Sequence, residues 1–294
     1  MTDAAYPVEH RDNEDVVLLP FARSHLEGAL KLSQEMSWPY RIEDWDVALQ
    51  LGHGFVLERA GTGTGTVIGT AAWWPYGETH ASAGMIIVAK AAQGQGYGAR
   101  LMDALLASAR RRTIALNSTA EGITLYRRRG FVPTGIIHQH QGIPTVTQET
   151  PRSGLVRPMA ASEFEAIARL DRAATGLERR QLLNRLFDSG DGCVLLRDGT
   201  ICGYAISRLF GRGHVIGPVV AESPTDARAL IEFAIARLGP VFVRIDIPAS
   251  SQLGEWLESI GLQRVSDATT MVLGPPGPWT GPARMFGLAN QSFG

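Results

Sequence analysis

Hydrophobic and polar positions in the first half of the chain follow two alternating periods. Short runs rich in Val, Ile, Leu and Trp are typical of strands, and apolar residues spaced by a helical turn are typical of amphipathic helices. In the segment 97–112, the side chains of Leu101, Met102, Leu105, Leu106 and Ala109 share one helical face, which we expect to pack on a sheet. The pattern predicts strands at 16–19, 55–59, 67–74, 85–89, 113–117 and 131–139, and helices from about 24, at 42–51, at 97–112 and up to 129.

After a segment of linker composition at 149–154, the same order of elements starts again. Strands are predicted at 155–157, 193–197, 201–208, 215–220 and 241–247, followed by a final strand pair, and helices at 161–174, 178–187, 225–238 and 252–260. The sequence therefore predicts an α/β fold (α+β, mixed sheet) with two domains of one type, each a twisted sheet flanked by helices. We place the first domain at 1–148, the second at 155–274, and a Pro-rich connector with a tail at 275–294.

Composition narrows the classes of function. The length of 294 residues agrees with two domains, and a formal net charge of −1 offers no field for nucleic acid or an anionic membrane, so neither is expected as a partner. The N-terminal stretch lacks the pattern of a signal peptide, and no apolar run reaches about 18 residues, so we expect a cytoplasmic protein. Cys193 and Cys202 fit buried free thiols better than a disulfide or a metal pair.

A glycine-rich turn follows the strand 85–89 and opens the helix at 97. Glycines allow close backbone approach, and the start of a helix attracts anions, so this turn can cradle a pyrophosphate. A dinucleotide fold would need Gly-x-Gly-x-x-Gly with an acid after the next strand, and a P-loop would need Gly-Lys-Ser/Thr, so neither pattern fits. The turn consists of Gln93, Gly94, Gln95, Gly96, Tyr97 and Gly98.

A second motif runs from Leu125 through Tyr126 to Gly130 and Phe131. Together the two motifs resemble those of the Gcn5-related N-acetyltransferases (GNAT), which are Gln/Arg-Gly-x-Gly-x-Gly/Ala and Leu-Tyr-x-x-x-Gly-Phe. The resemblance covers about residues 14–148 and implies acetyl-CoA as co-substrate, bound by the glycine turn, with no metal. It also implies that Tyr126 protonates the departing CoA sulfur. The alternative for Tyr126 is an aromatic ring that only packs at a helix end.

The same resemblance assigns further contacts to the cofactor. The backbone at Ile87 and Val88 is implied to face the pantetheine and the acetyl group, and Asn117, at a strand end, could hydrogen-bond the cofactor or water. The whole chain resembles two-domain bacterial acetyltransferases with a degenerate, YitH-like second domain. Its turn at 220–224 lacks the glycines and carries Glu222, and no tyrosine stands at 256–259, so we expect one acetyl-CoA site per chain.

Candidates for the base and for the acceptor site come from the first domain. Glu78 and His80, in the predicted loop before the strand 85–89, are candidate bases, with His53 or a water chain as alternatives. Trp38 and Trp73 could wall an apolar acceptor pocket, although tryptophans of this kind often belong to the core.

In the second domain, Asp171 and Arg179 belong to the segment 171–180, which connects two predicted helices. By the resemblance, this is the region where acetyltransferases hold their acceptors. Asp171 could bind a substrate ammonium and Arg179 a carboxylate, but an ordinary helix-loop-helix with ion pairs explains them equally well. The leading hypothesis is an N-acetyltransferase for a small-molecule amine. A CoA-binding sensor or scaffold without turnover and a protein-lysine acetyltransferase are the alternatives, and a homodimer is left open.

Overall fold

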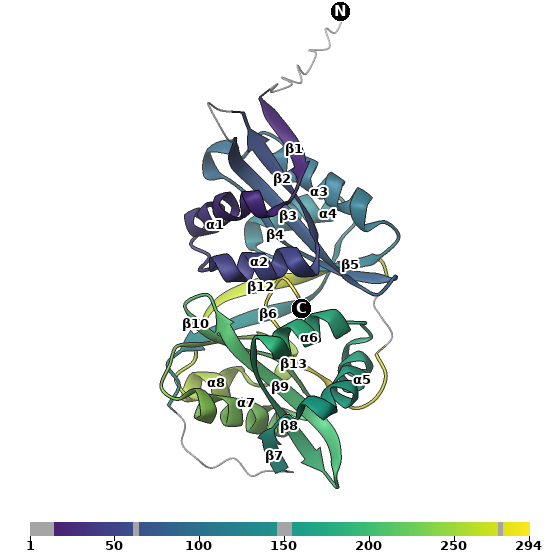
Figure 1. The fold of residues 1–294 in the computed structure, drawn as a ribbon, viewed down its shortest axis with the longest axis vertical. Coiled ribbons are helices and arrows are strands. Elements are labelled where there is room, and N and C mark those ends of the chain that lie inside the picture. Colours follow the sequence, from purple (N-terminus) through teal and green to yellow (C-terminus); the bar gives the residue numbers. More distant parts are fainter. Residues whose placement is uncertain (1–14, 61–64, 146–154, 276–278) are drawn as a thin grey trace, which may run out of the picture.

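The computed structural model describes residues 15–60, 65–145, 155–275 and 279–294, and strands of both halves form one continuous sheet (Figure 1). The predicted linker at 149–154 lies outside the described residues. The first half contains β1 (Val16–Pro20), α1 (Leu26–Glu35), α2 (Ile42–Leu51), β2 (His53–Arg59), β3 (Thr66–Tyr76), β4 (His80–Val88), α3 (Tyr97–Ala109), β5 (Thr113–Ser118), α4 (Ile123–Arg127) and β6 (Val132–Gly142). The second half contains β7 (Leu155–Pro158), α5 (Phe164–Thr175), α6 (Arg180–Asp188), β8 (Gly190–Arg197), β9 (Thr200–Phe210), β10 (Gly213–Ala221), α7 (Pro224–Leu238), β11 (Val243–Pro248), α8 (Gly254–Ser259), β12 (Gln263–Leu273) and β13 (Arg284–Gly287).

The strands β6 and β12 are exchanged between the halves. The strand order is β1-β2-β3-β4-β5-β12-β6-β11-β10-β9-β8-β7, with β13 beside β10. β12 pairs antiparallel with β5, where Thr269 stands opposite Ser118, and β6 pairs antiparallel with β11, where Ile137 stands opposite Pro248. The predicted α/β class is confirmed, but the two halves share one sheet where separate sheets were expected.

The sheet has the same order of strands from both ends. From either end, five strands of one half are followed by the exchanged strand of the other half. β6 and β12 pair with each other around Ile137 opposite Ala268, and both have the same succession of exposed and buried positions. The halves are therefore related by an approximate twofold axis through this strand pair, and positions on β5 have counterparts on β11.

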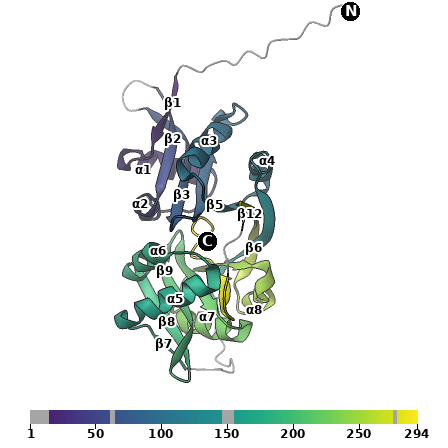
Figure 2. The same cartoon turned by 90° about the vertical axis from the view of Figure 1, so that its right-hand side faces the viewer.

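Helices cover both faces of the sheet (Figure 2). α1, α2, α5 and α6 share one buried cluster that spans the two halves and includes Trp45, Trp74 and Leu183. On the other face, α3 packs on the first half, and its residues Leu101 and Leu105 are buried as predicted. A buried leucine side chain stabilises a fold by about 1.5–3 kcal/mol. Because the first cluster contains residues of both halves, core packing joins the halves in addition to strand pairing.

Several local predictions can be compared directly with the structure. α2 has the predicted bounds, whereas β4 begins at His80 because residues 80–83 pair with both β3 and β5. Cys193 and Cys202 are free and buried as predicted, and burial raises the pKa of the Cys193 thiol to about 12. Among the helices in the described part of the chain, none has the length and apolar character needed to cross a membrane.

Candidate active site

The parallel strands β4 and β5 pair over only part of their length. Residues His80–Ala83 stand opposite Thr113–Leu116, and beyond them β4 bulges. At the bulge, Met85 has a φ of 52°, and the Thr70 hydroxyl donates a hydrogen bond to the Met85 carbonyl oxygen at 2.7 Å. From Gly84 to Val88, the backbone of β4 therefore has no ladder partner on β5 among the described residues. This open edge can pair with the amide groups of an extended ligand.

The backbone of Ile87 and Val88 lies on this open edge, where the resemblance expects it. The Ile87 side chain is buried and the Val88 side chain is partly buried against α3, so the main-chain atoms are the hydrogen-bonding groups that this edge offers to a ligand. Gln93 fastens the following turn to the strand, because its side-chain amide donates to the Val88 carbonyl oxygen at 3.1 Å. The open edge and the glycine turn are thus held in a fixed relation.

The turn itself has an open, anion-binding geometry. Gly94 and Gly96 have φ values of 79° and 81°, and Gly96 caps the N-terminus of α3 without any side-chain hydrogen bond. A Cβ at either glycine would meet no atom within 4 Å, so the turn faces open space. Gln95 is exposed, whereas the Tyr97 ring is buried and leaves only its backbone for a ligand. These residues fit the pyrophosphate of CoA, which the helix N-terminus would favour.

Tyr126 lies on α4 and is 7% exposed. Its ring packs edge-on against Phe131, with ring centroids 5.9 Å apart. Tyr126 also lines a cavity together with Met85 and Ile86 of the β4 bulge. Burial raises the pKa of its phenol to about 12, so the hydroxyl stays protonated at neutral pH and can act as a proton donor.

The cavity has a volume of about 390 Å³ and is built by both halves of the chain. The first half contributes the bulge, Tyr126, the loop between α1 and α2 with Trp38, and β6. The second half contributes the turn between β9 and β10, part of β11, part of β12, and the segment 288–294. The position of Trp38 agrees with a role in the wall of an acceptor pocket.

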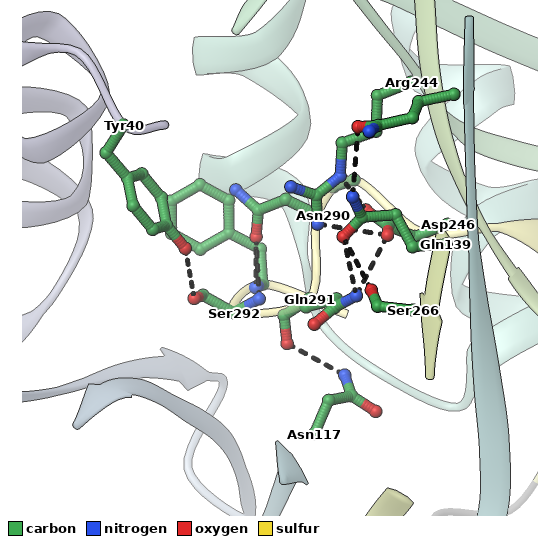
Figure 3. A network of polar contacts seen from close by, with 12 residues as sticks. Tyr40, Asn117, Gln139, Arg244, Asp246, Ser266, Asn290, Gln291 and Ser292 are labelled. Carbon is green, nitrogen blue, oxygen red and sulfur yellow. Dashed lines mark hydrogen bonds and ion pairs between the residues drawn. The ribbon is translucent and has the colours of Figure 1, made fainter. Parts of the chain in front are cut away.

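The segment 288–294 crosses the boundary between the halves (Figure 3). The Asn117 side-chain amide donates to the Gln291 carbonyl oxygen at 2.8 Å, and the Asn117 oxygen accepts from the Thr270 hydroxyl at 2.7 Å. On the other side, the Gln291 side chain donates to the Asp246 carboxylate at 3.0 Å. Asn117 lines the cavity, where a contact with the cofactor or with water was expected, and both ends of its amide also hold protein groups that anchor this segment.

Three predicted site residues lie outside the cavity wall. Trp73 packs on the face covered by α3 and beneath the Arg112 guanidinium, which lies 5.3 Å from its ring centroid. His80 is the first residue of β4, and its ring contacts the Thr79 hydroxyl at 2.9 Å, while Glu78 lies in the turn before it. The bulge and Tyr126 are at the opposite end of that strand, so the structure does not bring either candidate base to the reaction site.

Asp171 and Arg179 form an internal ion pair. Both are at most 2% exposed, and the Arg179 guanidinium donates to both oxygens of the Asp171 carboxylate, at 3.1 and 2.5 Å. The Tyr204 hydroxyl donates to the same carboxylate at 2.5 Å, and Arg179 donates to the Gly294 carbonyl oxygen at 2.9 Å. Neither residue lines the cavity. The alternative of a structural ion pair therefore describes them, and we no longer assign them to an acceptor.

The second half lacks the cofactor features of the first. Between β10 and α7 lie only Glu222 and Ser223, whereas the corresponding turn of the first half runs from Ala89 to Gly96. The main-chain bonds that close the helix after Tyr126 are repeated after Leu257, so a leucine occupies the position of the tyrosine. In addition, β13 pairs with β10 over Val219–Ala221 and lies along the edge that corresponds to the open edge of β4.

The cavity also contains residues that the sequence analysis missed. Gln139 and Gln141 on β6, Arg212 after β9 and Arg244 on β11 all line it. Their type and spacing carry no motif, and they meet only because β6 is exchanged into the sheet of the second half.

Both halves of the chain match models of a known protein family. Two family models, each described as an acetyltransferase (GNAT) domain, match residues 50–133 and 167–287. A Bacillus subtilis protein named uncharacterized N-acetyltransferase YitH is 26% identical over 288 residues, which cover 95% of this chain and all of that protein. Holothin acyltransferase of a Pseudoalteromonas species is 29% identical over 178 residues, which cover 59% of each chain.

Solved structures show the same fold. A proposed acetyltransferase from Pyrococcus horikoshii has a TM-score of 0.78 and 19% identity, with 99% of this chain and all of that chain covered. A tandem GNAT protein from the clavulanic acid biosynthesis pathway has a TM-score of 0.61 and 16% identity, with 89% and 98% covered. The chain therefore belongs to the GNAT acetyltransferases and carries two GNAT domains in tandem.

Proposed function

We propose that this chain transfers the acetyl group of acetyl-CoA to a primary amine of a small molecule held in the cavity. One observation carries the proposal: the Tyr126 side chain and the β4 bulge line the same cavity as side chains from the second half. A proton donor, an edge for the cofactor and a space for the acceptor thus meet in one place.

The residues support direct transfer. The amine nitrogen attacks the thioester carbonyl carbon, a C–N bond forms, and the C–S bond breaks. Backbone N–H groups on the open edge of β4 would stabilise the charge that develops on the carbonyl oxygen. The Tyr126 hydroxyl gives its proton to the departing thiolate and regains one from solvent. Because neither Glu78 nor His80 lines the cavity, the proton lost by the amine passes to water.

The size of the cavity favours a small acceptor. A volume of about 390 Å³ lies in the range of pockets that enclose small ligands, and its walls come from the α1–α2 loop, the β9–β10 turn and segment 288–294. A protein-lysine acetyltransferase would need an open groove for the peptide on both sides of the lysine. A CoA-binding sensor without turnover would have no need for a buried, protonated Tyr126 beside the open edge.

The experiment compares Tyr126→Phe with the wild type in acetyl-CoA binding and in thiol release with a panel of primary amines. The ring and its packing are preserved, so we expect the acetyl-CoA dissociation constant to change by less than about threefold and kcat to fall by about 10² or more. Tyr204→Phe serves as a control for the loss of a phenol hydroxyl, because Tyr204 is also buried but does not line the cavity.

Two results would contradict the proposal. Acetyl-CoA binding without thiol release for every amine would favour the sensor. Equal rates for the wild type and Tyr126→Phe would remove the proton-donor role and leave the hydroxyl structural.

A further inference from the structure

Arg244 and Gln141 form a matched pair of donors in the cavity wall. They stand opposite each other in the ladder between β11 and β6, so their side chains project from the same face of the sheet as neighbours. Both line the cavity. This pairing exists only because β6 lies beside β11.

Arg244 is held in place by a buried acid. Its Nε and Nη2 atoms donate to the two Asp246 carboxylate oxygens at 2.9 and 3.0 Å, and Asp246 is fully buried. Asp246 is itself held by the Gln291 side chain (Figure 3). The Arg244 Nη1 atom has no hydrogen-bond partner within the described ranges. The guanidinium is thus fixed on one side and has a free donor on the other.

Gln141 is oriented by a second chain of hydrogen bonds. The Ser266 hydroxyl donates to Gln139 Oε1 at 3.4 Å, which leaves the Gln139 amide nitrogen to donate to Gln141 Oε1 at 3.2 Å. Gln141 must then present its own amide N–H groups, and no acceptor for them exists among the residues the structure describes. An arginine donor and an amide donor therefore stand side by side without an acceptor.

The charge of the wall is also unbalanced. Two cations line the cavity: Arg244, whose charge the Asp246 carboxylate balances, and Arg212, which has no acidic partner among the described residues. The one acid among the described lining residues, Asp267, is already paired with Arg264 through two hydrogen bonds at 2.8 and 2.5 Å. A ligand with a negative group would restore the balance.

The related cavity of the other half provides an internal comparison. A space of about 600 Å³ is lined by β6 and the segment 288–294, together with the ends of β5 and β11. There the ladder position of Arg244 and Gln141 is taken by Ala115 opposite Val272. No charged side chain lines that cavity in the part of the chain that is described. The donor pair is thus specific to the cavity that contains Tyr126.

Aromatic rings form another part of the wall. Trp38 and Tyr40 come from the loop between α1 and α2, and Phe210 meets Tyr40 edge-on with centroids 5.5 Å apart. β11 lies three strands away from β5, about 14 Å across the sheet, and an arginine side chain bridges only part of that distance. An apolar spacer would fill the remainder.

From this geometry we infer that the acceptor is an amine that carries a carboxylate, with an apolar body between or beside the two groups. The carboxylate binds Arg244 and Gln141, with Arg212 at the rim, and the amine points toward the β4 bulge and Tyr126. This inference rests on the proposed function, because it names the substrate class of the same site.

The test uses two pairs of probes that differ in the carboxylate. They are 4-(aminomethyl)benzoate against 4-methylbenzylamine, and phenylalanine against phenethylamine. Thiol release from acetyl-CoA is measured with the full chain. We expect kcat/KM to be at least about tenfold higher for the carboxylate in one pair or both, since a charge-assisted contact contributes about that much.

Variants then assign the preference to residues. Gln141→Leu disturbs no buried charge and resembles the counterpart Val272, and Arg244→Gln with Asp246→Asn removes the cation together with its buried partner. Each should lower kcat/KM for the preferred carboxylate by about 10- to 100-fold and change that of the neutral amine by less than about threefold. Arg172→Gln is the control, because its side chain is 69% exposed and does not line the cavity.

Calorimetric titration of the probes into the CoA-bound chain separates this inference from the proposed function. Carboxylate binding that depends on Gln141 and Arg244, without turnover of any probe, would support a carboxylate site in this cavity and would contradict the proposed transfer to the bound amine. Acetylation of neutral amines with no preference for the carboxylate in either pair would overturn the inference and leave the function intact. Absence of binding and turnover for all four probes would also overturn the inference.

Discussion

Replacement of Arg179 by leucine tests whether this residue is structural. Its guanidinium is enclosed with the Asp171 carboxylate, the Tyr204 hydroxyl and the Gly294 carbonyl oxygen. Burial alone would lower the pKa of Arg179, but the Asp171 carboxylate raises it above its ordinary value, so the guanidinium keeps its charge. Arg179→Leu leaves a buried carboxylate with a hydroxyl as its remaining donor.

The size of the effect follows from this environment. Removal of one partner from a buried ion pair costs about 3–5 kcal/mol, because the remaining charge stays buried without its counter-ion. Folded proteins have a total stability of about 5–15 kcal/mol, so the loss is a large fraction. With a urea dependence of about 2–3 kcal/mol per molar, the unfolding midpoint should fall by about 1–2.5 M.

The measurement is urea unfolding followed by tryptophan fluorescence, with Arg180→Leu as the matched control. Arg180 is the next residue, and it forms an exposed ion pair with Glu165, which solvent screens, so its midpoint should stay close to that of the wild type. Equal midpoint shifts for both variants would refute the reasoning. An unchanged midpoint for Arg179→Leu together with a raised KM for the acceptor would restore Arg179 to the substrate site.

Four further outcomes are expected. Tyr126 is active as an acid only while protonated, and its pKa is about 12, so kcat should not fall on its account up to pH about 10 and should fall as the pH rises through 12. Gly96→Val places a β-branched side chain at a φ of 81° on the open turn, so calorimetry should show acetyl-CoA binding weakened by at least about tenfold, and backbone strain of about 1–3 kcal/mol should lower the urea midpoint by about 0.3–1.5 M. The wild-type stoichiometry should be close to one acetyl-CoA per chain, and two equal sites would contradict the account of the second half. The fragment 1–148 lacks β12 between β5 and β6, so circular dichroism should show no cooperative unfolding, whereas a normal melting transition would contradict the role of the exchange.

Local features of this protein could be predicted from its sequence. The turn around Gly94 and Gly96, the helix that begins at Tyr97 and the position of Tyr126 follow from motifs in which a few adjacent residues determine the backbone. The apolar face of α3 could be predicted because its apolar residues recur at the spacing of a helical turn, which is the pattern of a helix that packs on a sheet with one face. In each case the relevant interactions are close in the sequence or are implied by one periodic pattern.

Features that depend on long-range pairing were not predictable in this way. Nothing in β6 or β12 shows which half it joins, because strand propensity is the same on either side of the pair. For the same reason, the contact of Asn117 with Gln291, which is far away in the sequence, could not be foreseen beside the expected contact with the cofactor or with water. Asp171 and Arg179 have the residue types of a ligand site, and only their burial reveals that they neutralise each other.

The single segment 288–294 distinguishes this protein from a symmetric pair of subunits. The exchange of β6 and β12 has the geometry of a strand-swapped homodimer joined into one chain. Gln291 bridges Asn117 on β5 and Asp246 on β11, which are near-equivalent positions of the two halves. In a true homodimer, two identical copies of this segment would compete for the same space on the axis. Because both halves belong to one chain, only one copy of the segment has to fit on the axis. The two halves can then differ in sequence, so that the first carries the reacting groups and the second contributes side chains to the cavity wall.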